Sequence, residues 1–185
     1  MKQTKMNTGV VRASYLNATT PRAAQGSSDA KYSVQLLIPK TDTETVKNIR
    51  ECIANAVVND KENKNHLKGI VEPKHPLHDG DGLKPSGVPY GEECKGHWVV
   101  TASSKNKPGL VDINNDPLTD PAEWYSGIYV RANINFYSFN SNGNRGIACG
   151  LNHLQKRKDG EPLGGGGNAS AAFDDGFVDE ESILD

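Results

Sequence analysis

Alternation of apolar and polar residues predicts several short β-strands along this chain. In residues 31–38 (KYSVQLLI) one face is apolar, and the opposite face carries Lys31, Ser33 and Gln35. The same kind of reading predicts strands at residues 8–16, 97–104, 109–113, 127–139 and 146–155. A turn at residues 140–144 (NSNGN) joins the last two strands into a hairpin.

One segment shows helical spacing instead. Apolar residues between Val46 and Val57 recur at the period of an amphipathic helix, which we expect over residues 42–59, packed against the sheet. Thr41 and Glu44 fit a capping box at its start. Residues 68–96 are rich in Pro and Gly and have no clean period, so they predict a long surface excursion. Many short strands with one helix predict a small β-barrel or an open sheet.

Charge divides the chain into two parts. Residues 164–185 begin with four glycines and contain six of the 23 acidic residues but no Lys or Arg. Residues 1–163 keep all 21 basic residues against the other 17 acidic ones, a formal charge of +4. We therefore predict one folded domain at residues 1–163, followed by a Gly-rich linker and a disordered acidic tail at 164–185. A basic body with an acidic tail suits a protein that handles a polyanion.

Other sequence features narrow the cellular setting. The three cysteines have no CxxC spacing and no secretory leader precedes them, which predicts reduced thiols inside a cell. No apolar run approaches the ~18 residues of a membrane span. We expect a protein of the cytoplasm.

The predicted strand at residues 127–139 carries the most informative chemistry. Its inward face is apolar, whereas its other face combines rings, amides and a guanidinium on Tyr129, Arg131, Asn133, Asn135, Tyr137 and Phe139. Single-stranded nucleic acid calls for this mixture, because each base has a π-face and the backbone attracts positive charge. The alternative is that Tyr129 and Tyr137 cover a second small core beneath the long loop.

Several side chains elsewhere would extend this surface. They are basic or aromatic and belong to neighbouring strands and turns: Arg12, Tyr15, Lys31, Lys105, Lys107, Lys156 and Arg157. Nothing in these residues distinguishes DNA from RNA.

A second chemistry is conceivable in the long excursion. His78, Asp79 and Asp81 offer nitrogen and oxygen ligands for a divalent metal, as in a metal-dependent nuclease. However, no second pair of Cys or His has a structural-zinc spacing, and Asp-Gly repeats are ordinary in turns. We therefore predict no metal, no cofactor and no catalytic residue.

At this level of detail the chain resembles a known family, the OB-fold single-stranded-DNA-binding proteins of tailed bacteriophages. The resemblance rests on an ordered set of segments: PLHDGD (76–81), GHW (96–98) with ASS (102–104), PGLVD (108–112), residues 125–137, GIACGLN (146–152), QK (155–156) and DGEPLGG (159–165). His78 departs from the basic residue expected there, and residues 82–94 look longer than usual.

The resemblance implies a mainly β protein with a five-stranded OB-fold barrel, one α-helix and long loops. It also implies binding of single-stranded DNA with little sequence preference, in phage replication, recombination or repair within the infected bacterium. In this reading the tail competes with DNA and recruits replication proteins through Asp174, Asp175, Phe177, Asp179, Glu180, Glu181, Ile183, Leu184 and Asp185. An adaptor that acts only through this tail remains the alternative, and a homo-oligomer is compatible with either.

Overall fold

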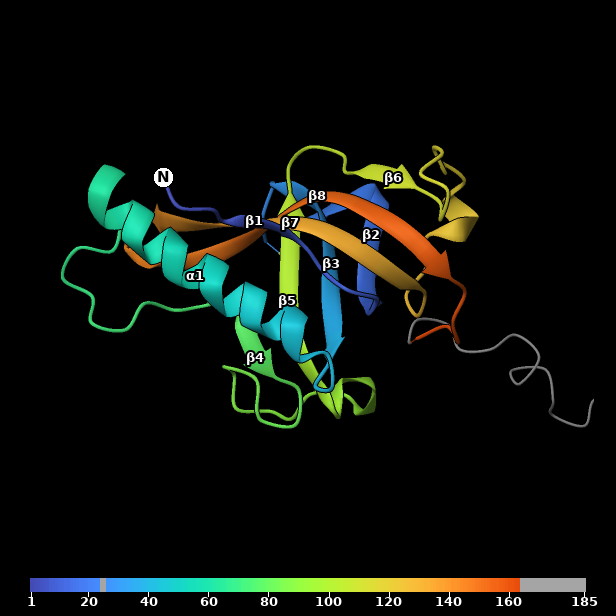
Figure 1. Cartoon of the computed structure of the whole chain (residues 1–185), viewed down its shortest axis with the longest axis horizontal. Coiled ribbons are helices and arrows are strands. Elements are labelled where there is room, and N and C mark those ends of the chain that lie inside the picture. The colour runs from blue at the N-terminus through green and yellow to red at the C-terminus, as the bar shows by residue number, and fades with distance from the viewer. Residues whose placement is uncertain (24–25, 164–185) are drawn as a thin grey trace, which may run out of the picture.

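A computed structural model describes residues 1–23 and 26–163 of this chain. Within them lie eight strands, one α-helix and two short 3₁₀ helices (Figure 1). The strands are β1 (Lys5–Asn7), β2 (Val11–Ala23), β3 (Ala30–Pro39), β4 (Leu77–Asp79), β5 (His97–Ser104), β6 (Gly109–Val111), β7 (Tyr129–Ser141) and β8 (Asn144–Lys158). The helices are α1 (Thr43–Asn63) and the 3₁₀ turns Glu92–Cys94 and Pro121–Glu123.

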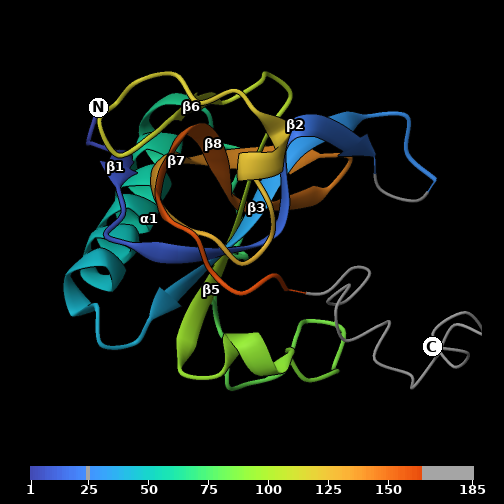
Figure 2. The same cartoon turned by 90° about the vertical axis from the view of Figure 1, so that its right-hand side faces the viewer.

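Five of these strands close into a barrel. Neighbours around the ring are β2, β3, β5, β8 and β7, and β7 returns to β2 through the pair Val11 and Val130. The β5–β8 pair is parallel, and the other pairs in the ring are antiparallel. This arrangement confirms the predicted mainly β, five-stranded OB-fold barrel with one helix. Figure 2 shows the β2–β3 hairpin projecting from the ring as an arm.

The barrel is filled by the apolar faces that alternation predicted. On β7 the inward residues Val130, Ala132, Ile134 and Phe136 are all buried, and Ile128 just before the strand is buried with them. Two irregularities in the β7–β8 register add an extra residue to β8, at Asn152 and at Arg157. These bulges decide which β8 side chains face outward.

Helix α1 packs against β7 and β1 and covers one side of the barrel (Figure 1). Its residues Val46, Ile49, Cys52 and Ala56 belong to the barrel core. The predicted capping box was wrong, because the N-cap is Asp42, whose carboxylate accepts hydrogen bonds from the backbone N–H and the hydroxyl of Thr45. The helix also runs four residues beyond the predicted end.

Other boundaries differ from the sequence prediction. Strand β2 begins at Val11 and continues to Ala23, seven residues past the predicted end, with register irregularities between Ser14 and Arg22. Strand β1 was not predicted, and β6 is two residues shorter than expected. The long excursion contains β4 and a 3₁₀ turn that buries Cys94 against Leu37 and Val99.

The acidic tail and its proposed partner-binding residues lie outside the described residues. Among residues 1–23 and 26–163, no helix is long and apolar enough to cross a membrane.

Candidate nucleic-acid interface

The predicted outward row of β7 lies on the barrel exterior, and its members fall into three environments. In the first environment, the ring of Tyr129 contacts two cationic side chains. The Nζ of Lys158 lies 4.5 Å from the ring centroid, and the Cζ of Arg12 lies 5.7 Å from it. Arg12 also donates hydrogen bonds to the carbonyls of Gly127 and Glu161. The Tyr129 ring is therefore half-buried and held by two cations before any ligand arrives.

Arg131 and Asn133 line a polar groove of about 390 Å³ beside β6 and β8. The Nε of Arg131 donates to the carbonyl of Thr8 (2.9 Å), and the side chain remains exposed. Asn133 donates to Asn7 and accepts from Asn152, so its amide is fixed in orientation. The groove is completed mainly by amide and imidazole side chains: Asn7, Asn115, His153 and Gln155.

Asn135, Tyr137 and Phe139 face small residues on β8. Their register partners are Gly150, Ala148 and Gly146, respectively. Tyr137 is 37% exposed, whereas Phe139 is only partly exposed and the backbone of Lys74 lies over its partner Gly146. Partial burial raises the pKa of the Tyr137 hydroxyl, with a smaller contribution from Cys149, so the group stays neutral near pH 7.

Strand pairing extends this surface around the barrel. The outward residues Asn17, Ser33, Ser103, Gly150 and Asn135 are successive register partners across β2, β3, β5, β8 and β7. We call this row the polar lane. All its side chains are small or amide-bearing, while the neighbouring residues Val34, Ala102, Cys149 and Phe136 point into the core. The lane runs perpendicular to the strands, from the β2–β3 arm to β7.

Exposed cations lie near both ends of the lane and next to its middle strand, β5. Arg22 and Lys31 are register partners on the arm, and Lys105 and Lys107 follow the end of β5. Lys5 of β1 pairs with Asn135 at the other end. Among the described residues, none of these five side chains forms a salt bridge, since those found involve Lys40, Lys95 and Lys156. These charges are available to phosphates.

Lys156 is separated from this surface. It pairs with Val130 on the inward side, is 8% exposed, and binds Glu123 (2.5 Å) and Asp159 (2.7 Å) through its ammonium. Burial alone would lower the pKa of Lys156, but the two carboxylates outweigh it and the pKa is raised. Arg157 occupies the adjacent bulge and donates to Gln155.

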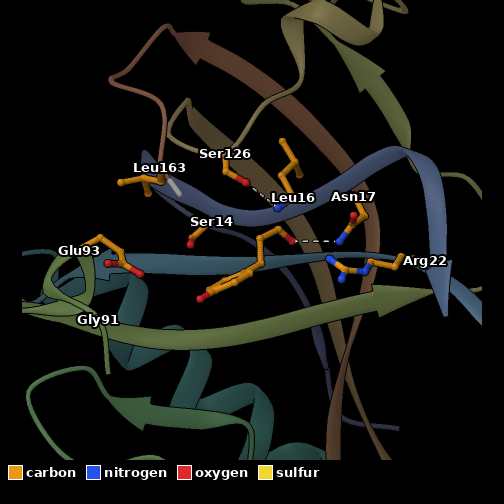
Figure 3. Close-up of a pocket in the computed structure, with 9 residues that line it drawn as sticks. Ser14, Leu16, Asn17, Arg22, Gly91, Glu93, Ser126 and Leu163 are labelled. Atoms are coloured by element: carbon orange, nitrogen blue, oxygen red, sulfur yellow. Dashed lines mark hydrogen bonds between the residues drawn. The ribbon is translucent and has the colours of Figure 1, made fainter. Parts of the chain in front are cut away.

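A further groove lies beside Tyr15, at the base of the β2–β3 arm (Figure 3). It measures about 520 Å³ and is lined from β2, from the segment around Gly91, from Ser126 and from Leu163. Tyr15 is 64% exposed. Of the two predicted site residues on β2, Tyr15 has a ring that is accessible to solvent. The guanidinium of Arg12 is already engaged with Tyr129 and two backbone carbonyls.

The acidic loop offers little to a metal. The ammonium of Lys40 binds both Asp79 and Asp81 at 2.6 Å. These hydrogen bonds from Lys40 are the main reason that the pKa of each carboxyl is lowered. A divalent cation would have to displace the ammonium. Within residues 1–23 and 26–163, no group of three or more His, Cys, Asp or Glu is placed to hold a metal.

The sequence prediction missed the lane residues Asn17, Ser33 and Ser103, and also Arg22 and Lys5. Part of the signal was present, because Ser33 and Gln35 alternate with buried residues in a predicted strand. What the sequence did not contain is the order of strands around the ring, which places these residues in one row.

Comparison with known proteins gives consistent matches over most of the chain. The family described as "Enterobacter phage Enc34, ssDNA-binding protein" matches residues 4–183. "Putative protein p50" of Acyrthosiphon pisum secondary endosymbiont phage 1 is 31% identical over 189 residues, covering 97% of this chain and 98% of that protein.

Two solved structures of one phage protein are also similar. The single-stranded DNA-binding protein from bacteriophage Enc34, as a C-terminal truncation, matches with a TM-score of 0.69 and 28% identity, covering 86% of this chain and 88% of that one. The same protein in complex with ssDNA matches with a TM-score of 0.68 and 28% identity, covering 86% and 89%.

Proposed function

Because this chain belongs to the family of the Enterobacter phage Enc34 ssDNA-binding protein, we propose that it binds single-stranded DNA along its polar lane. In OB folds, oligonucleotides cross the face of the second and third barrel strands, between the loop joining strands one and two and the loop joining strands four and five. Here those strands are β3 and β5. The flanking loops are the tip of the β2–β3 arm and the turn at Asn142 and Gly143.

The observation that carries the proposal is the register of the lane. Small polar groups from five adjacent strands leave a path along which a sugar-phosphate chain can lie close to the barrel. Tyr15 stands near one end of the path, and Tyr137 and Phe139 stand near the other. Aromatic rings of this kind stack bases of any identity, with each base contributing about 1–3 kcal/mol.

Cations complete the proposed interface. Lys31, Lys105, Lys107, Arg22 and Arg131 would neutralise phosphates, and Asn133 and Asn135 would contact sugars or base edges. Arg157 lies at the margin of this surface. Tyr129 and Arg12 would support it mainly by fixing the strand end, and Lys156 is left out because its charge is already paired.

A direct titration tests the function. Fluorescence anisotropy with a labelled dT oligonucleotide should give saturable binding that weakens as salt increases, whereas the matching duplex should bind far less. Equal affinity for duplex, or binding that ignores salt, would contradict the proposal. The same titration with an RNA oligonucleotide measures the preference between DNA and RNA.

The acidic tail has a proposed role in regulation. Its six carboxylates would compete with DNA for the cations of the body and, once displaced by DNA, would be free to recruit replication proteins. Residue 163, which immediately precedes the tail, lines the Tyr15 groove. Pull-down with full-length and truncated protein would separate recruitment through the tail from DNA binding by the body.

We propose no catalytic activity. The alternative of a metal-dependent nuclease would need Asp79, Asp81 and His78 to hold Mg²⁺, but the two carboxylates bind Lys40. Incubation of end-labelled single-stranded DNA with the protein and Mg²⁺ or Mn²⁺ should leave the strand intact. Cleavage that is lost in Asp79→Asn would support the nuclease instead.

The setting we propose is phage replication, recombination or repair in the cytoplasm of the infected cell.

A further inference from the structure

The Tyr15 groove has features that a simple path for the DNA backbone does not require. Its volume of about 520 Å³ lies within the range of small-ligand pockets. Its walls come from segments far apart in the chain: the bulged part of β2, the turn around Gly91 and Glu93, Ser126 before β7, and Leu163. Figure 3 shows Glu93 and Arg22 at opposite ends of this space.

The backbone at Tyr15 is held in an uncommon conformation. Its φ of 45° lies in the left-handed region, which costs a non-glycine residue about 1–2 kcal/mol. Two hydrogen bonds fix the bulge, one from the Asn17 amide to the Tyr15 carbonyl (3.3 Å) and one from the Leu16 N–H to the Ser126 hydroxyl (3.0 Å). The ring of this residue is exposed to solvent. Strained positions of this kind concentrate at functional sites.

The charges at the two ends of the groove are opposite and free. Neither Arg22 nor Glu93 takes part in a salt bridge within the described part of the chain. Glu93 is half-buried, and its carboxylate lies near Gly91 in the turn. In such a pocket a ring can stack on a base, a cation can bind a phosphate, and a carboxylate can accept a hydrogen bond from an amino group of the base.

We propose that this groove holds one unstacked nucleotide of the bound strand and prefers a base that carries an exocyclic amino group. The proposal rests on the proposed function. The ring of Tyr15 stacks on the base, Arg22 binds the adjacent phosphate, and the Glu93 carboxylate accepts a hydrogen bond from the amino group. Cytosine, adenine and guanine all carry such a donor, whereas thymine does not.

Thymine is the disfavoured base in this arrangement. It has no exocyclic amino group, and its O4 carbonyl would face the negative charge of Glu93. A hydrogen bond to a charged acceptor at a partly exposed site changes affinity about fivefold, the equivalent of about 1 kcal/mol. The other contacts along the lane do not depend on the identity of the base. The preference of this one groove therefore changes the total affinity for an oligonucleotide only modestly.

The test compares dC and dT oligonucleotides of 12 nucleotides at pH 8, in competition for the full-length protein. We expect wild-type protein to favour dC by about fivefold. In Glu93→Gln the side-chain amide can donate to thymine O4, so the ratio should fall to about one or reverse. Equal affinities in the wild-type protein, or a dC preference that Glu93→Gln leaves intact, would overturn the proposal. Failure to bind either oligonucleotide would instead overturn the proposed function.

A second variant separates the ring from the backbone. Asn tolerates a left-handed conformation, so Tyr15→Asn should keep or raise the melting temperature while it weakens binding and removes the dC preference. Tyr15→Phe keeps the ring and should preserve both. If Tyr15→Asn folds and retains the wild-type dC preference, the ring does not hold the base and the proposal is wrong.

Discussion

Asn135 of β7 occupies the space that a side chain at Gly150 of β8 would need. The Oδ1 atom of Asn135 lies 2.5 Å from the position of a Cβ atom built on Gly150. The two residues are register partners at the point where the polar lane crosses from β8 to β7. The surface of the lane therefore lies close to the backbone at this point, because β8 contributes no side chain and the Asn135 amide of β7 lies over Gly150.

This relationship predicts a coupled pair of substitutions. Gly150→Ala should lower the free energy of unfolding by no more than about 1 kcal/mol, because the new methyl group displaces only the end of the Asn135 side chain, which can rotate. Adding Asn135→Ala should recover most of that loss, so the two changes are not additive. Urea denaturation of the two single variants and the double variant measures the coupling. Simple additivity would mean that the amide moves away without cost.

Lys105 and Lys107 should set part of the salt dependence of DNA binding. Each phosphate contact on a single strand contributes about 0.7 to the slope of log K against log salt, so Lys105→Gln with Lys107→Gln should reduce it by about 1.4. Lys47 and Lys61 are exposed on α1, and their double Gln variant is the matched control. A slope that changes equally in both variants would show a general effect of net charge rather than local contacts.

Tyr137 should act through its ring. Tyr137→Ala should weaken binding by about 1–3 kcal/mol, the usual contribution of one stacked base, whereas Tyr137→Phe should have little effect. Because burial raises the pKa of the Tyr137 hydroxyl, that group should also add no pH dependence between pH 6 and pH 9. Anisotropy titrations of the three proteins compare these outcomes. Equal losses in both variants would point to the hydroxyl instead.

Lys156 and Arg131 should show opposite phenotypes. Lys156→Met removes the partner of Glu123 and Asp159, whose carboxylates stay accessible to water, and should reduce the free energy of unfolding by about 1 kcal/mol or less, with the salt slope of binding unchanged. Arg131→Gln should reduce the slope by about 0.7 and leave stability nearly unaffected. A reduced slope in Lys156→Met would place that ammonium in contact with DNA after all.

The same ion pair gives a pH test. Hydrogen bonds from Lys156 and Tyr125 lower the pKa of Asp159 in the folded protein. Its contribution to stability is therefore present above the ordinary Asp pKa of about 3.9 and is lost as the pH falls through the folded value. The stability difference between wild type and Lys156→Met should shrink in that acidic range.

Truncation after Leu163 tests the role of the tail. Removing six carboxylates that compete for the basic body should tighten DNA binding, most clearly at low salt where screening is weak. A full-length control in which the six acids become Asn or Gln should bind like the truncation. Unchanged or weaker binding by both proteins would exclude competition by the tail.

Local pattern predicted much of the fold. Strand β5 lies where alternation placed it, and the inward faces of β3 and β7 are the predicted ones, because a half-buried strand must alternate. The helix was also predictable from its spacing. Its first turn was not, since Thr41 and Asp42 are both good capping residues and only the path of the chain from Pro39 selects the second.

The candidate site was harder to predict because it depends on register. Lys156 was expected on the surface with its neighbours, but alternation places it inward and the bulge at Arg157 returns Lys158 to the side of Tyr129. A single extra residue in a β-bulge exchanges the inward and outward positions of all later side chains in the strand. The pattern of apolar and polar residues does not show where such a bulge lies. The lane likewise exists only once five distant strands are in register.

Two short pairings hold the barrel ring closed. Strands β2 and β7 pair only through Val11 with Val130 and Arg12 with Tyr129. The other short joint is the parallel pair of β5 and β8, which pair only through Ala102 with Cys149 and Ser103 with Gly150. Ser103 and Gly150 are also where the lane passes over that joint. A DNA strand bound there would contact both β5 and β8, so local opening between these strands should be rarer in the DNA-bound protein than in the free protein. Backbone amide hydrogens near the joint should then exchange with solvent more slowly when DNA is bound.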